Sequence, residues 1–116
     1  MSTNKIVVGA HYGLRDWLGQ RITGALLALY AVMLVLLSWS KAELSYGTWA
    51  GMFAEPWLKV ATLMAILALI YHAWVGIRDI YMDYIQPTGV RLTLQVLTIL
   101  ALLGYAFWAL VILWRV

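Results

Sequence analysis

The sequence predicts an all-α membrane protein with three transmembrane helices, and composition is the first observation behind this prediction. Apolar residues make up 65% of the 116 positions and charged residues only 11%, whereas the apolar fraction of a soluble domain lies near half. The second observation is three long stretches that are almost free of charge. Because backbone polar groups in lipid must be satisfied within the segment, a stretch of about 20 apolar residues crosses the membrane as a helix.

The three expected spans cover about residues 18–40, 57–82 and 91–114, within a single membrane-anchor domain of residues 1–116. The first contains ITGALLALYAVMLVLLSW and the third LTLQVLTILALLGYAFWALVILW, and neither run carries a charge. The second, VATLMAILALIYHAWVGI, is interrupted only by His72. Four tryptophans fall toward span ends, where the amphipathic indole prefers the headgroup level: Trp39, Trp57, Trp108 and Trp114.

Basic residues near the span ends predict the direction of the chain across the membrane. Five lie on one side, namely Lys5, Arg15, Arg21, Arg78 and Arg91, and three on the other, namely Lys41, Lys59 and Arg115. Because an excess of Lys and Arg marks the cytoplasmic side, we expect the N-terminus in the cytoplasm and the C-terminus outside. The connection at 42–57, AELSYGTWAGMFAEPW, is then expected to be an ordinary external loop at the membrane surface.

Composition also excludes several classes of function. The chain has no cysteine, which excludes disulfides, thiolate metal sites and cysteine-ligated iron–sulfur clusters. The net charge of +3 comes from residues at span ends, without the basic face that nucleic-acid binding requires. The polar start, MSTNK, is not followed by the compact apolar core of a cleavable signal, so we expect the first span to remain in the mature protein.

Polar residues at the end of the second span form a stripe. His72, Gly76, Asp79 and Asp83 are separated by four, three and four residues, so on one helix they fall within roughly 40° of each other. This requires the helix to continue past Arg78 as far as the QPTG break. Asp83 then lies about 16 Å beyond His72 along the axis, which places His72 inside the membrane and Asp83 at its cytoplasmic surface.

A histidine at this depth is expected to be neutral, because a charged one is costly, and its ring nitrogens need partners. One interpretation is a hydrogen bond to a neighbouring helix. The other is axial ligation of a haem, which Gly76 favours by letting a flat macrocycle or another helix approach. A bis-histidine centre needs a second imidazole, and His11 lies in the polar stretch before the first span. The second ligand would therefore come from another chain, within a larger heteromeric helix bundle.

Other polar residues allow two interpretations each. Arg21 enters the first span at the level expected for haem propionates, but a topology-setting charge that snorkels to the headgroups explains it equally well, and we favour snorkelling for Arg15. Tyr84 and Asp83 offer a hydroxyl donor and a carboxylate for protons, the chemistry that an interfacial quinone head group requires. Alternatively, Tyr84 belongs to the aromatic belt and Asp83 ends the helix in solvent.

The motif HAWVGIRDIYMDYIQP, followed by RLTLQ and preceded by RITGALLALY in the first span, resembles the smaller of the two hydrophobic membrane anchors of bacterial succinate dehydrogenase (complex II). The resemblance covers roughly residues 13–114. It implies a bacterial inner membrane protein with a periplasmic C-terminus. It also implies that the chain pairs with a second three-span membrane anchor to hold one haem b, and that the two anchors dock the iron–sulfur and flavoprotein subunits to the membrane.

The resemblance also implies roles for single residues. His72 falls where the smaller anchor supplies one axial ligand to the haem iron, the other coming from the second anchor. Tyr84 falls on the tyrosine that hydrogen-bonds ubiquinone, and Asp83 on its neighbour at the quinone site. Arg21 matches the basic residue near the haem propionates. Arg15 stands where this family is expected to have histidine, so no role is carried over to it.

We therefore expect an electron-transfer anchor without catalytic residues of its own. Succinate oxidation would take place in the soluble partners, and ubiquinone would be reduced beside Tyr84 and Asp83, which joins the tricarboxylic acid cycle to the respiratory chain. One alternative is the anchor of a fumarate reductase or a menaquinone-linked relative. The other is a cofactor-free membrane assembly subunit in which His72 only bonds a neighbouring helix.

Overall fold

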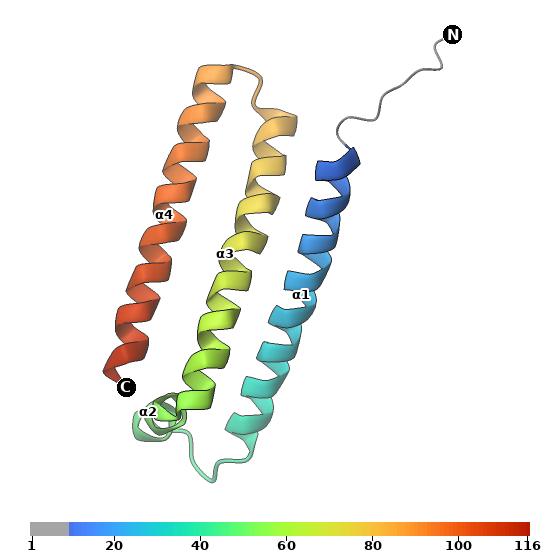
Figure 1. The fold of residues 1–116 in the computed structure, drawn as a ribbon. Helices are drawn as coiled ribbons and strands as arrows, with labels where there is room; N and C mark the ends of the chain where they lie inside the picture. The colour runs from blue at the N-terminus through green and yellow to red at the C-terminus, as the bar shows by residue number, and fades with distance from the viewer. Residues whose placement is uncertain (1–9) are drawn as a thin grey trace.

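The computed structural model describes residues 10–116, with side chains from residue 13 onward. Over this range it contains four helices and no strand: α1 (Ala10–Trp39), α2 (Tyr46–Ala54), α3 (Pro56–Tyr84) and α4 (Thr88–Arg115). The three long helices lie side by side with α3 in the middle, and α3 packs against both α1 and α4 (Figure 1). Consecutive long helices run antiparallel: α1 is joined to α3 through α2 at the lower end in Figure 1, and α3 to α4 by a short connection at the upper end.

The three long helices are apolar and long enough to cross a membrane. The candidate spans are Gly13–Trp39, Pro56–Tyr84 and Thr88–Arg115. At a rise of about 1.5 Å per residue each measures about 40 Å, which exceeds the hydrocarbon thickness of about 30 Å and leaves both ends in the headgroup layers. The predicted fold class, all-α with three membrane-spanning helices, is confirmed; the direction of crossing stays a prediction.

Two helix ends differ from those that hydropathy alone predicts. α1 begins at Ala10, eight residues before the expected span, and in this early part Asp16 pairs with Arg78 of α3. α3 ends at Tyr84, and Ile85 is already extended, since the ring of Pro87 disfavours helical backbone at the residue before it. The helix therefore does run past Arg78 to the QPTG break, as the polar stripe requires.

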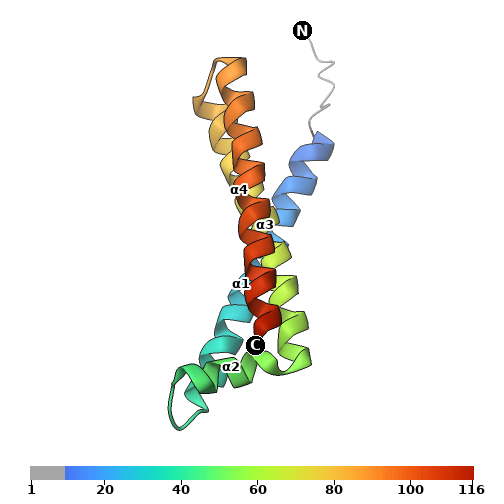
Figure 2. The same cartoon turned by 90° about the vertical axis from the view of Figure 1, so that its left-hand side faces the viewer.

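The connection between the first two spans is not the loop that we expected. It contains α2, which lies crosswise under the ends of the long helices (Figure 2). The Ser45 side chain caps the helix by accepting from the Thr48 backbone N–H at 3.2 Å. Trp49 and Phe53 stack with ring centroids 5.5 Å apart, and Met52 is buried. Apolar residues at helical spacing thus give α2 one face that packs onto α3.

Little of the apolar surface is buried within the chain. Among the described residues the buried core consists of six side chains: Met52, Leu58, Ala65, Ala68, Val75 and Leu113. Four of these lie on α3, where the two alanines let a neighbouring helix approach closely. Most large apolar side chains of α1 and α4 face outward, as expected for helices surrounded by lipid or by other membrane helices.

Candidate functional site

Polar contacts join α1 to α3 in antiparallel order along their interface. Asp16 pairs with Arg78, Thr23 with His72, and Tyr30 with Thr62. As the residue number rises along α1 it falls along α3, so a single antiparallel alignment of the two helices accounts for all three contacts. The His72 contact lies between the other two and forms the centre of the candidate site.

His72 is held by α1 through one ring nitrogen. Its Nδ1 lies 3.1 Å from the Thr23 hydroxyl oxygen. The Thr23 hydroxyl donates its only hydrogen to the Gly19 carbonyl at 2.7 Å, with the Gln20 carbonyl further away at 3.3 Å. With its hydrogen on the Gly19 carbonyl, the hydroxyl oxygen is free to accept a hydrogen from Nδ1; in that tautomer the lone pair lies on Nε2.

The other ring nitrogen of His72 is left for a partner outside this chain. Nε2 forms no hydrogen bond with the described residues, and it is absent from the atoms that these residues enclose without a partner. The Cε1 edge of the ring lies over Gly24, where an added Cβ would be 3.5 Å away. This geometry fits an imidazole that presents Nε2 to a metal, because the ring is fixed by one nitrogen and open at the other.

Two other glycines allow close contact between the helices near His72. A Cβ added to Gly76 would lie 3.6 Å from the Gln20 side-chain nitrogen, so Gly76 receives an α1 side chain. A Cβ added to Gly19 would overlap the Tyr71 hydroxyl, so a side chain there would displace the Tyr71 ring. Tyr71 is next to His72 in the sequence, so Gly19 leaves room for the ring beside the site.

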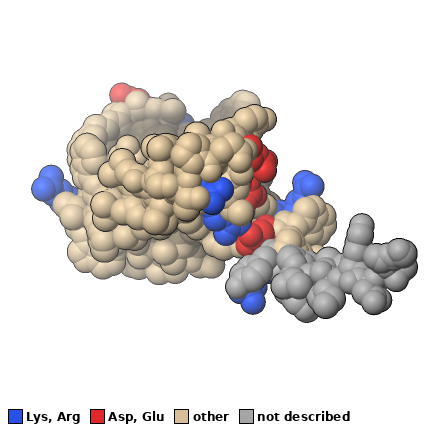
Figure 3. Space-filling view, turned by 90° about the horizontal axis from the view of Figure 1, so that it is seen from above, with Lys and Arg blue, Asp and Glu red and all other residues tan. Residues whose placement is uncertain are grey.

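The N-terminal end of this interface carries an ion pair. Arg78 donates to Asp16 across the interface and to Asp79 on its own helix at 3.3 Å. The Asp16 and Arg78 side chains are 22% and 27% exposed, whereas Asp79 is 58% exposed, so the pair with Asp16 is the better shielded. Viewed from this end of the molecule, red carboxylates gather on one flank beside a basic group, and the rest of the visible surface is largely uncharged (Figure 3).

The structure does not bring the other predicted site residues to His72. Arg21 is exposed and its guanidinium lies 5.1 Å from the centre of the Trp17 ring, on the same helix. Tyr84 is the last residue of α3 and is 79% exposed, and Asp83 is also exposed. Their predicted roles remain predictions. His11 lies in the first turn of α1, and its side chain is outside the described residues.

Sequence reasoning missed Thr23, Gly19 and the Asp16–Arg78 pair. A usable signal was present, because aligning α1 and α3 antiparallel with His72 opposite Thr23 also brings Asp16 close to Arg78. Within the described part of the chain, no three His, Asp or Glu side chains gather in a way that holds a metal ion. A single imidazole is the ligand that these residues offer.

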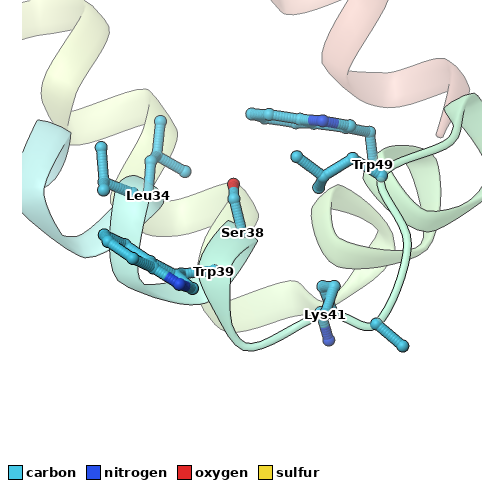
Figure 4. A pocket seen from close by; sticks show the side chains of 8 residues that line it. Leu34, Ser38, Trp39, Lys41 and Trp49 are labelled. Carbon is cyan, nitrogen blue, oxygen red and sulfur yellow. The ribbon is translucent and has the colours of Figure 1, made fainter.

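A hollow lies at the opposite end of the bundle from the Asp16–Arg78 pair, beside the C-terminal end of α1. It has a volume of about 580 Å³ and is lined by Leu34, Val35, Ser38, Trp39, Lys41, Ala42, Leu44 and Trp49. Figure 4 shows the Trp39 and Trp49 rings on opposite sides of it, with Ser38 between them and Lys41 on the connecting loop. Indoles and a lysine beside aliphatic side chains are typical of the headgroup level, so this hollow marks the membrane boundary at that end.

Fold and site together define an integral membrane protein that presents one imidazole and a broad apolar surface to neighbours. The family profile described as succinate dehydrogenase/fumarate reductase transmembrane subunit matches residues 1–113. The chain belongs to this family and is a multi-pass membrane anchor subunit.

Curated relatives agree with this assignment. The succinate dehydrogenase hydrophobic membrane anchor subunit of Coxiella burnetii is 38% identical over 102 residues, which covers 88% of this chain and 89% of the relative. The proteins of the same name from Rickettsia felis and Rickettsia conorii are 30% and 32% identical. These matches cover 80% and 76% of this chain and 78% and 71% of the relatives.

Proposed function

We propose that the chain is the cytochrome b anchor of a succinate:ubiquinone oxidoreductase and holds one haem b together with a second membrane anchor. The observation that carries this proposal is the His72 ring, which contacts the Thr23 hydroxyl through Nδ1 and has no hydrogen-bond partner for Nε2 among the described residues. A bound haem supplies one-electron transfer. His72 would provide one axial ligand, and Thr23 and Gly24 orient its ring.

Arg21 is proposed to neutralise the haem propionates. It lies on α1 only two residues before Thr23, and its side chain is exposed on the surface of the chain. Two residues turn a helix by about 200°, so Arg21 and Thr23 leave α1 in different directions. Contact with a propionate therefore requires the long Arg21 side chain to reach around α1, away from its position over Trp17.

Tyr84 and Asp83 are proposed to form one wall of the ubiquinone site. Both lie at the end of α3 and are exposed, so a neighbouring chain can complete the site around them. The Tyr84 hydroxyl would donate a hydrogen bond to a quinone carbonyl, and the Asp83 carboxylate would organise the protons that reduction consumes. Succinate oxidation would belong to the flavoprotein subunit. Electrons would arrive through the iron–sulfur subunit, on the cytoplasmic face of a bacterial inner membrane.

The family description also names fumarate reductase, so the anchor of such an enzyme, or of a menaquinone-linked relative, is the second candidate. The relatives from Coxiella and Rickettsia favour succinate dehydrogenase, because each is named as its membrane anchor. Extraction of the quinone that copurifies with the complex separates the two candidates.

The test is His72→Ala in the complete complex, with His11→Ala as the matched control. We expect His72→Ala to remove the sharp reduced-haem bands from the optical spectrum while all the protein components still copurify, because the iron loses an axial ligand. His11→Ala should keep the full haem content. A native complex without reduced-haem bands, or full haem content after His72→Ala, would overturn the proposal.

A further inference from the structure

We propose that Thr23 is a positioning residue that sets the donor strength and orientation of the His72 ring. The inference deepens the proposed function and rests on it, since it requires His72 to ligate a haem iron. Thr23 does not touch the iron; it acts through Nδ1 of the ligand. Its role is to keep the proton on Nδ1 so that Nε2 carries the lone pair.

The direction of the hydrogen bonds carries this inference. A threonine hydroxyl has one hydrogen, and in a helix it commonly donates to the carbonyl four residues earlier. Thr23 does so to Gly19 at 2.7 Å, the shorter of its contacts. If His72 accepted at Nδ1 instead, Thr23 would release Gly19, and Nε2 would carry a hydrogen and no lone pair for a metal. The short contact to Gly19 therefore supports the tautomer that can ligate.

The surroundings of Thr23 keep its hydroxyl in this position. Gly19 lies one turn before it beneath the Tyr71 hydroxyl, and Gly24 follows it beneath the His72 ring. Because neither neighbour has a side chain, α1 approaches α3 closely here and Thr23 is half-buried between them. Among the described residues, Thr23 is the one that hydrogen-bonds the imidazole.

This contact has a consequence for the redox potential. A hydrogen bond from Nδ1–H to an oxygen increases the electron density on Nε2 and makes the imidazole a stronger ligand. A stronger donor stabilises the oxidised iron relative to the reduced iron, which lowers the midpoint potential. Loss of the Thr23 hydroxyl should therefore raise the midpoint potential of the haem, and it should also free the ring to rotate about its bond to iron.

Thr23→Val and Thr23→Ser in the purified complex test the inference. Valine has nearly the shape of threonine without the hydroxyl, whereas serine keeps the hydroxyl and loses the methyl group. We expect Thr23→Val to shift the midpoint potential upward in a redox titration and to change the low-spin haem signal in electron paramagnetic resonance. Thr23→Ser should leave both close to native.

Thr62→Val is the matched control. Thr62 hydrogen-bonds Tyr30 across the same two helices at 2.6 Å, so its loss loosens the interface without touching His72. We expect it to leave potential and spectrum unchanged. If Thr23→Val loses its haem while Thr23→Ser keeps it, the inference is also supported.

Three results would overturn the role of Thr23 alone: a native potential and signal in Thr23→Val, an equal shift in Thr62→Val, or equal loss of haem from both Thr23 variants. A native complex without haem would instead overturn the proposed function itself.

Discussion

At the scale of single residues, the site depends on which hydroxyls are already bonded within the chain. The Tyr81 hydroxyl is bonded to Thr98 on α4 at 2.9 Å. The Tyr84 side chain, three residues later on the same helix, is exposed and forms no hydrogen bond with the described residues. Tyr81 therefore contributes to helix packing, whereas the Tyr84 hydroxyl has no partner among the described residues.

This difference gives a paired prediction for quinone reduction. We expect Tyr84→Phe to lower quinone-reductase activity about five- to tenfold, since one hydrogen bond to the substrate is worth about 1–1.5 kcal/mol and about 1.4 kcal/mol is a factor of ten. Succinate oxidation measured with an artificial dye should stay unchanged, because it bypasses the quinone. Steady-state assays with both acceptors measure the two rates.

Tyr81→Phe is the control for Tyr84→Phe. It removes a hydroxyl that is bonded within the chain, so quinone reduction should stay near native. Equal loss of dye and quinone activities in Tyr84→Phe would indicate failed assembly and contradict the proposed contact.

Some of these residue-scale features follow from the sequence and some do not. Helical spacing placed His72 and Gly76 on one face, and both do face α1. The partner of His72 was not predictable in this way, because Thr23 lies in another helix and its role depends on the register between the two. The tautomer depends in addition on a backbone carbonyl, which no side-chain pattern reports.

At the scale of helices, the Asp16–Arg78 ion pair fixes α1 against α3 one polar layer away from His72. The paired side chains are shielded from water, but not fully. Removing one partner leaves the other charge partly desolvated without an opposite charge beside it. This costs more folding free energy than replacing both partners together. The ion pair should therefore contribute to the alignment of Thr23 with His72.

We expect Arg78→Gln to destabilise the complex by about 1–3 kcal/mol, the usual worth of hydrogen bonds to charged groups. The measurement is the temperature at which haem is released from the purified complex. Asp16→Asn should have a similar effect, and the double variant should cost less than the sum of the two, because the residues act as a pair.

Asp79→Asn provides the control for the ion pair. Asp79 also contacts Arg78, but at 3.3 Å and with a largely exposed side chain, and exposed pairs contribute little. A loss as large as that of Asp16→Asn would show that net charge at this end of the bundle, and not the contact across the helices, is what matters.

Helix prediction succeeded where the physical signal was long and failed where it was short. Three runs of apolar residues identify α1, α3 and α4, and Pro87 marks the end of α3. α2 was missed because nine residues give few helical repeats, and its stability depends on packing against α3. The early start of α1 was missed because hydropathy reports lipid contact, whereas this part of the helix carries the charged Asp16, which pairs with Arg78.

At the scale of the whole molecule, the described helices bury little of their apolar surface against one another. α1 and α4 expose most of their large apolar side chains, and only α3 among the described long helices has others on two sides. An Nε2 atom of His72 without a partner among the described residues is compatible with the proposed site shared between chains. Counting histidines in the sequence predicts a second ligand from another chain, and the structure adds that Nε2 of His72 has no partner among the described residues.

The direction of the chain across the membrane gives a prediction that single cysteines can test, because the native chain has no cysteine that would also react. Single cysteines replace Ala42, in the connection before α2, and Gln86, in the connection before α4; both positions are exposed. With five basic residues at one end and three at the other, the positive-inside rule places position 42 outside and position 86 in the cytoplasm. In intact spheroplasts a membrane-impermeant maleimide should therefore label Ala42→Cys.

Gln86→Cys should be labelled only after detergent opens the membrane, which also shows that the soluble subunits do not cover it. The native chain is the blank, because it has no thiol. Labelling of Gln86→Cys before detergent, with Ala42→Cys protected, would reverse the topology. The end of α3 with Asp83 and Tyr84 would then face away from the cytoplasm, and a quinone site fed from cytoplasmic subunits could not be built from these two residues.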